Sequence, residues 1–100
     1  MSSELSEKQK KFLRGLAHGR HPLVQIGKEG FSAAISNELE GALTAHELVK
    51  VRARVGDRDE RDAIFAQLAN ASASEMVQRI GNVGVFFRKR KEKSKIVLPD

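Results

Sequence analysis

The sequence contains Leu23-Val24-Gln25-Ile26-Gly27-Lys28-Glu29-Gly30-Phe31-Ser32, in which a short apolar segment runs directly into a glycine loop. Residues 23–26 are too few for a helix and are typical of a buried strand. Ser32 is a good N-cap for the helical pattern that continues to His46. A strand, a glycine loop and a helix N-terminus in this order allow backbone N–H groups to face a phosphate.

The residues that follow this stretch complete a strand–helix–strand unit. One face of the helix ending at His46 carries Ile35, Leu39 and Leu43 at helical spacing. The next segment, Leu48 to Val55, alternates between apolar residues and the basic residues Lys50, Arg52 and Arg54. This alternation predicts a strand with one face on the core and one face in water, and the unit predicts a right-handed crossover between parallel strands.

The remaining segments predict two more helices and a hairpin. Ser6 and Gln9 form a capping box for a helix from Ser6 to His18, and Asp57 or Asp59 caps a third helix. Strands are predicted at 76–80 and 85–88, joined by a hairpin loop at 81–84. The expected fold is a two-layer α/β sandwich in the order α-β-α-β-α-β-β. Its four-stranded sheet is mixed, because two crossovers give parallel neighbours and the hairpin gives an antiparallel pair.

Length and composition favour a single domain over residues 1–100. Apolar residues make up 40% of the sequence and there is no cysteine, which excludes disulfides and thiolate metal sites. No apolar run reaches the roughly 20 residues of a membrane span, and residues 1–11 are polar, unlike a signal peptide. We therefore expect a cytoplasmic, monomeric protein with neither a membrane partner nor a small-molecule substrate.

The net charge of +5 is concentrated near the C-terminus. Residues 79–95 include seven basic residues and one acidic residue, whereas the rest of the chain has 11 basic and 12 acidic residues. The basic segment 88–95, on an otherwise neutral body, favours a polyanionic partner. A solvated tail that only aids solubility has the same composition.

The chain has two G-x-x-G segments, and they differ in their surroundings. Gly27 to Gly30 precedes a helix N-terminus and contains Lys28, so it can bind an anion. Gly81 to Gly84 lies between two strands, where turn geometry alone accounts for its glycines. The first segment matches neither a nucleotide P-loop nor a dinucleotide fingerprint. It fits the loop with which KH-type domains clamp the backbone of single-stranded nucleic acid.

Four ordered motifs make the sequence similar to a known family. These are 16–18 (Leu-Ala-His), 22–30, 46–51 (His-Glu-Leu-Val-Lys-Val) and 77–81 (Val-Gln-Arg-Ile-Gly). They resemble the CRM domain in its stand-alone, bacterial YhbY-like form, from about Leu5 to Leu98. The resemblance implies an RNA-binding fold like the C-terminal domain of a bacterial translation initiation factor, with a KH-like glycine loop. It also implies ribosomal RNA of the large-subunit precursor as partner, and a role in ribosome assembly.

The predicted RNA-binding residues come from the loop, the first helix and the basic segment. Lys28 and the loop N–H groups would hold phosphates, the first helix would widen that patch, and the basic segment would add electrostatic affinity. The family usually has Leu-Tyr-Arg where this chain has Phe86-Phe87-Arg88, so a ring is present without its hydroxyl. We expect at most one of these two rings in the core, leaving the other free to stack on a base or to pack. The full predicted set is Gly27, Lys28, Glu29, Gly30, Ser32, Lys10, Arg14, Arg88, Lys89, Arg90 and Lys91.

Other functions have weaker support in the sequence. His18, His21 and His46 have no further ligand fixed beside them, so we predict no metal site and no cofactor. No nucleophile–base–orienter set is visible, and the acids at 57–62 fit helix capping better than magnesium binding. The prediction is a non-catalytic RNA-binding protein. The alternatives are a protein-interaction module with a basic tail for an acidic partner and, with less support, a magnesium-dependent nuclease.

Overall fold

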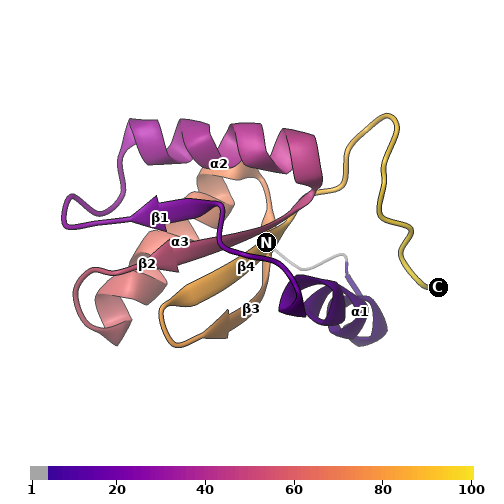
Figure 1. Ribbon diagram of the computed structural model, residues 1–100, viewed down its shortest axis with the longest axis horizontal. Coiled ribbons are helices and arrows are strands. Elements are labelled where there is room, and N and C mark those ends of the chain that lie inside the picture. The colour runs from indigo at the N-terminus through magenta and orange to yellow at the C-terminus, as the bar shows by residue number, and fades with distance from the viewer. Residues whose placement is uncertain (1–4) are drawn as a thin grey trace.

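The computed structural model describes residues 5–100 and has the predicted order of elements (Figure 1). Residues 1–4 of the predicted domain lie outside the described residues. The helices and strands are α1 (Glu7–His18), β1 (Val24–Ile26), α2 (Ala33–His46), β2 (Leu48–Ala53), α3 (Arg58–Ser72), β3 (Glu75–Ile80) and β4 (Val83–Phe87).

The helices α1 and α2 begin after the predicted caps, and α3 begins after Asp57, one of its two candidate caps. Ser6 and Gln9 form the complete capping box of α1. The Ser32 hydroxyl accepts the Ile35 N–H at 3.2 Å, and the Asp57 carboxylate accepts the Glu60 N–H at 2.9 Å. These bonds satisfy N–H groups that otherwise have no partner in the first turn of a helix.

The sheet is four-stranded and mixed, in the order β1-β2-β4-β3. β1 and β2 are parallel, as the strand–helix–strand unit predicts, and β4 is antiparallel to both of its neighbours. The expectation that both crossovers give parallel neighbours was wrong for β2 and β3, because β4 lies between them. A tight turn returns β4 beside β3, and the Asn82 carbonyl of that turn accepts the Ala53 N–H of β2.

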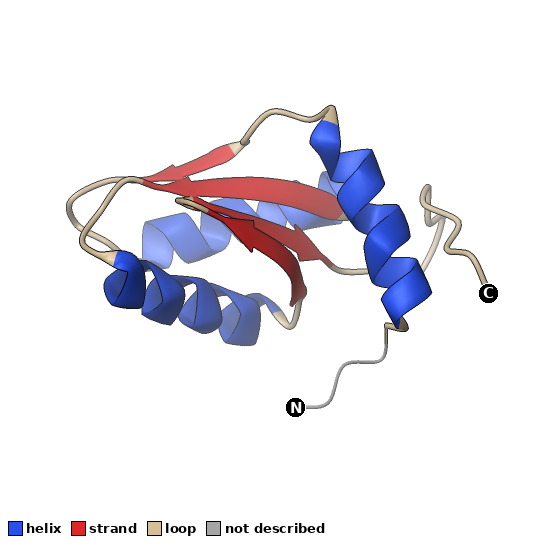
Figure 2. Cartoon of the chain, turned by 90° about the horizontal axis from the view of Figure 1, so that it is seen from below, coloured by secondary structure: helices blue, strands red, loops and turns tan. Residues whose placement is uncertain are grey.

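One face of the sheet packs against α2 and α3 (Figure 2). The α2 residues Leu39 and Leu43 and the α3 residues Phe65 and Leu68 are fully buried there. The rings of Phe65 and Phe86 meet edge to face with centroids 5.8 Å apart. This layer pair is the predicted α/β sandwich.

The opposite face of the sheet is covered at one end by α1 and the C-terminal segment. Leu13 and Ala17 of α1 and Ile96 of the C-terminal segment pack there with Phe87. Phe86 is 0% exposed and Phe87 5% exposed, so both rings are core residues on opposite faces. The expectation that at most one of them is buried was wrong, because α1 and the C-terminal segment give the second face a core of its own.

The second glycine pair is divided between a turn and a strand. The hairpin loop is shorter than the predicted four residues, because β4 already begins at Val83. Gly81 stands in the turn with φ +58°, whereas Gly84 is buried within β4. A Cβ on Gly84 would stand 3.0 Å from the ring of Phe86 and 3.3 Å from the ring of Phe65. Close approach to these two rings explains Gly84, so turn geometry explains only Gly81.

Candidate nucleic-acid interface

The glycine loop between β1 and α2 forms a turn at one end of the molecule (Figure 1). The Gly30 N–H donates to the Gly27 carbonyl at 3.0 Å. Gly30 has φ +66°, which favours glycine, and its Cα faces the end of the Ile64 side chain. Packing on α3 therefore fixes the loop, and Lys28 and Glu29 are exposed at its tip.

The N-terminus of α2 is suited to an anion. Its first turn, residues 33–36, consists of uncharged side chains, whereas α1 and α3 carry acidic residues in theirs. The partial positive charge of this helix end is thus not neutralised locally. The Glu29 carboxylate folds back to 3.6 Å from the point where a Cβ on Gly27 would stand. An RNA phosphate at the loop requires this exposed side chain to turn outward.

A strip of the sheet beside the loop is left open by α1. Gln25, Arg52, Val83 and Ile80 are paired successively across the four strands, on the face opposite to α2 and α3. Gln25 is exposed, and Ile80 is 66% exposed. Arg52 thus joins the open face, where a guanidinium and apolar side chains can contact a base.

Lys10 and Arg14 lie away from the loop and do not widen its patch as predicted. Figure 1 places α1 at the other end of the molecule, and the length of α2, about 20 Å, separates the two ends. The Lys10 ammonium lies 3.5 Å from the Glu75 carboxylate, and Arg14 donates to the Val77 carbonyl at 3.4 Å. Helical periodicity places these residues on one helix face, but it does not predict which end of the sheet that helix covers.

Arg88, another predicted RNA contact, joins three elements inside the fold. Its guanidinium contacts both Glu40 carboxylate oxygens at 2.8 Å and also donates to the Ser72 carbonyl at 2.8 Å. A further bond at 3.1 Å reaches the Thr44 hydroxyl. The side-chain hydrogen bond from Arg88 holds the pKa of Glu40 below its ordinary value. These contacts tie β4 to α2 and to the end of α3.

The sequence did not reveal the role of Glu47, a carboxylate that is 0% exposed between α2 and β2. One oxygen accepts the Lys95 N–H at 2.7 Å and the Ile96 N–H at 3.1 Å. The other accepts the Arg90 N–H at 2.9 Å and the Ser94 hydroxyl at 2.7 Å. This buried side chain thus ties the C-terminal segment to the α2–β2 junction, and the packing of Ile96 adds to its hold. The signals in the sequence are its place in the motif 46–51 and a charge directly before the buried run 48–49.

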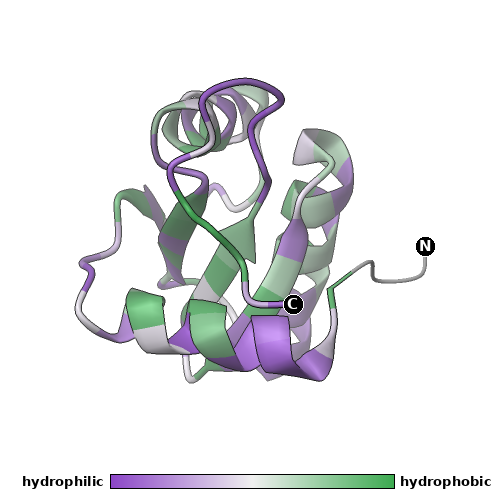
Figure 3. Cartoon of the chain, turned by 90° about the vertical axis from the view of Figure 1, so that its right-hand side faces the viewer, coloured by the Kyte–Doolittle hydropathy of each residue, from purple (hydrophilic) through white to green (hydrophobic). Residues whose placement is uncertain are grey.

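The basic segment 88–95 is consequently a fixed loop and not a free tail. Figure 3 shows its hydrophilic part looping out beyond the end of α2, while the apolar residues that follow run back over the sheet. Lys89 and Lys91 are exposed on this loop, whereas Arg90 is half-buried. The lysines are therefore presented to solvent by a backbone that Glu47 has already ordered.

Burial and hydrogen bonding act in opposite directions on the pKa of Glu47. Desolvation is the largest single effect and raises the pKa, but the backbone N–H groups of Arg90, Lys95 and Ile96 and the Ser94 hydroxyl together outweigh it. The pKa is lowered from its ordinary value of 4.5. Glu47 also has φ +65°, a conformation that costs about 1–3 kcal/mol in a residue other than glycine. The carboxylate bonds offset that strain.

We expect the C-terminal segment to detach on acidification. Because the folded-state pKa of Glu47 is depressed, its stabilisation is present above the unfolded pKa and is lost as pH falls through the folded pKa. Amide hydrogen exchange at Lys95 and Ile96 should therefore accelerate below about pH 4.5 relative to the core residue Val51. Equal protection of Ile96 and Val51 down to pH 3 would contradict this expectation.

Two other kinds of site find no support in residues 5–100. No group of histidine, aspartate and glutamate side chains in this part of the chain is arranged to hold a metal ion. Asp62, one of the acids weighed as a magnesium ligand, forms an ion pair with Arg79 at 2.6 Å. Among the same residues, no helix is long and apolar enough to cross a membrane.

Comparison with protein families places this sequence in a known family. The model of the CRS1 / YhbY (CRM) domain matches residues 5–88. The chain belongs to the CRM domain family. The match includes the glycine loop, the open strip and Glu47, and it ends at Arg88, before most of the basic loop.

Relatives of this CRM domain extend over nearly the whole chain. The sequence is 40% identical to an "RNA-binding protein" of Haemophilus influenzae over 95% of both chains. It is 37% identical to "Probable RNA-binding protein YqeI" of Bacillus subtilis over 95% of this chain and 99% of YqeI. The solution structure of a Staphylococcus aureus hypothetical protein superposes with a TM-score of 0.82 at 38% identity, covering 95% of this chain and 99% of that one. The fold is therefore shared with that Staphylococcus aureus protein of nearly the same length.

Proposed function

We propose that this CRM domain is a non-catalytic RNA-binding protein that binds ribosomal RNA of the large-subunit precursor in the cytoplasm and assists ribosome assembly. The observation that carries the RNA-binding step is the fixed glycine loop at the uncharged first turn of α2, with Lys28 exposed at its tip. The names of the Haemophilus and Bacillus relatives support RNA as the partner. The ribosomal target is proposed from the resemblance to stand-alone bacterial members.

The binding mode follows from where the basic groups lie. Lys28 and loop N–H groups other than that of Gly30, which donates to the Gly27 carbonyl, hold the phosphate backbone. The open strip with Arg52 offers a surface to unpaired bases. Lys89 and Lys91, at the other end of the molecule, attract more distant phosphates. Two basic regions separated by the length of α2 suit a folded RNA better than a short linear site.

Replacement of Lys28 by glutamate is expected to weaken RNA binding about tenfold, because a phosphate contact becomes a repulsion. Binding of a large-subunit rRNA fragment should be measured by fluorescence anisotropy at several salt concentrations. We expect log K to fall steeply with log salt, and less steeply in the variant. Lys8→Glu, on the exposed surface of α1, makes the same charge change at a distance and is the control. Equal affinity of the two variants would remove the loop from the site.

The ribosomal part of the proposal needs a separate measurement. Sequencing of RNA crosslinked to the protein in growing cells should yield large-subunit precursor sequences. Recovery of messenger RNA alone would contradict a role in subunit assembly while leaving RNA binding intact. Partners that persist after RNase treatment would instead favour a protein-interaction module.

A further inference from the structure

A groove lies at the start of β1, at the far end of that strand from the glycine loop. Its cavity volume is about 380 Å³, within the range of small-molecule sites. Leu23, Leu48 and Ile96 provide an apolar surface, with Ala45 beside them. Every titratable side chain that lines the groove is a lysine, an arginine or a histidine: Arg20, His21, His46, Lys50 and Lys95.

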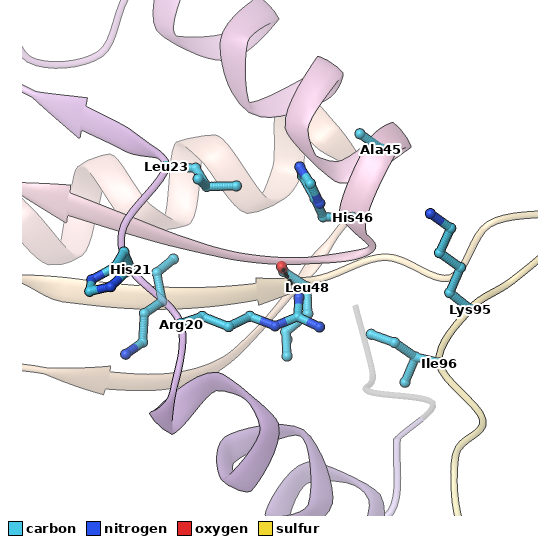
Figure 4. Close-up of a pocket in the computed structure, with 9 residues that line it drawn as sticks. Arg20, His21, Leu23, Ala45, His46, Leu48, Lys95 and Ile96 are labelled. Carbon is cyan, nitrogen blue, oxygen red and sulfur yellow. Dashed lines mark hydrogen bonds between the residues drawn. The ribbon is translucent and has the colours of Figure 1, made fainter.

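Hydrogen bonds within the fold hold two walls of this groove in place. Arg20 donates to the Leu48 carbonyl at 2.8 Å, which fixes its guanidinium beside β2. Lys95 and Ile96 are held on the other side through the bonds of their backbone N–H groups to Glu47. Figure 4 shows Arg20 below β2 and Lys95 on the other side of the groove, beside the end of α2. The groove is thus formed before any ligand arrives, which reduces the entropy lost on binding.

The combination of groups matches a nucleotide. Apolar side chains and imidazole rings pack against the faces of bases, and the imidazoles of His21 and His46 both line the groove. The ammonium groups of Lys50 and Lys95 can neutralise phosphates. An acidic peptide would use the lysines but would leave the apolar surface without a partner.

The open side of β1 separates the groove from the glycine loop. The Leu23 N–H donates to the Lys50 carbonyl at 3.0 Å, so the groove begins where β1 meets β2. From there to Gly27 the strand advances about 13 Å. This distance corresponds to about four nucleotides at the stacked rise of 3.4 Å. A single strand leaving the loop therefore reaches the groove within a few nucleotides.

We propose that this groove binds a nucleotide of the same RNA strand that the glycine loop clamps, with its base against Leu23 and its phosphate near Lys50 and Lys95. The proposal rests on the proposed RNA binding and adds a second contact to it. It makes affinity depend on RNA length, because about four nucleotides fill the loop and a longer strand is needed to fill the groove.

The test compares oligouridylates of about four and about twelve nucleotides, each carrying one 4-thiouridine. The double variant Lys50→Gln/Lys95→Gln keeps the side-chain stems and the backbone bonds to Glu47. It should bind the long RNA about tenfold more weakly and with a shallower salt dependence, and the short RNA as the wild type does. Crosslinks of the long RNA should map to peptides containing residues 20–23 or 45–50. Lys8→Gln/Lys11→Gln is the matched control on the exposed surface of α1.

If the double variant and the control bound the long RNA with equal affinity, the proposed nucleotide site in the groove would be wrong, while RNA binding itself would stand. Failure of the wild type to bind either oligouridylate, while it binds the large-subunit rRNA fragment, would likewise overturn the groove; failure to bind the rRNA fragment as well would overturn the proposed function. An oligoglutamate that bound as tightly as the long RNA, and lost affinity in the same variant, would overturn the assignment to a nucleotide in favour of an acidic protein segment.

Discussion

Replacement of Glu47 by glutamine is expected to lower the free energy of unfolding by about 2–4 kcal/mol. The glutamine amide keeps the shape of the side chain but offers one oxygen where the carboxylate offers two. Its NH₂ group would face either the N–H groups of Lys95 and Ile96 or the N–H of Arg90 and the Ser94 hydroxyl. Buried donors would then lose their acceptor, which costs about 1–3 kcal/mol each.

Urea unfolding of the wild type and of the Glu47→Gln variant measures this loss. Glu38→Gln, on the exposed surface of α2, is the matched control and should change stability by less than about 0.5 kcal/mol. Amide exchange at Ile96 separates local release of the C-terminal segment from global unfolding. Unchanged stability together with slow exchange at Ile96 would show that the carboxylate is not needed to hold the segment.

Replacement of Arg88 by alanine is expected to cost about 2 kcal/mol of stability and to leave RNA affinity within twofold. The loss comes mainly from the Ser72 carbonyl at the end of α3, which loses its donor. The ion pair with Glu40 contributes less, because the Glu40 side chain is 51% exposed and can be rehydrated. The variant also loses the link that the Arg88 guanidinium makes between α2 and the end of α3.

The control for this variant is Lys89→Ala, at the next position in the chain. Lys89 is exposed, so its replacement should leave stability unchanged and should weaken RNA binding and its salt dependence. Thermal unfolding and RNA titration of the two proteins should therefore give opposite patterns. An Arg88→Ala protein of normal stability and reduced RNA affinity would return Arg88 to the RNA-binding surface.

Local patterns in the sequence predicted much of this fold. The caps at Ser6 and Ser32 and the periodicity of the helices depend on residues close together in the chain, and the structure contains them. Of the two candidate caps of α3, the structure uses Asp57 and not Asp59. The glycine loop was placed correctly for the same reason. Contact between this loop and RNA stays a prediction, although the geometry of the loop suits a phosphate.

The features that the sequence did not predict depend on distant residues. The donors to Glu47 lie 43 to 49 positions further along the chain, beyond the reach of any local pattern. Phe87 is buried by residues of α1, which are far from it in the sequence, and by Ile96. The place of β4 between β2 and β3 depends on the pairing of all four strands. The basic groove was missed because its sides come from the α1–β1 connection, the end of α2 and the C-terminal segment.

The dependence of Glu47 on residues 90–96 has a consequence for translation of the protein. A nascent chain that has emerged only as far as Phe87 contains every helix and strand found in residues 5–100. At that point, however, the donors that bury the Glu47 carboxylate have not yet left the ribosome. An unpaired charge at the α2–β2 junction opposes closure of the sheet, so this step of folding awaits the emergence of residues 90–96. Lys95 and Ile96 also line the groove, so the nascent protein acquires this part of its surface only after its helices and strands have been made.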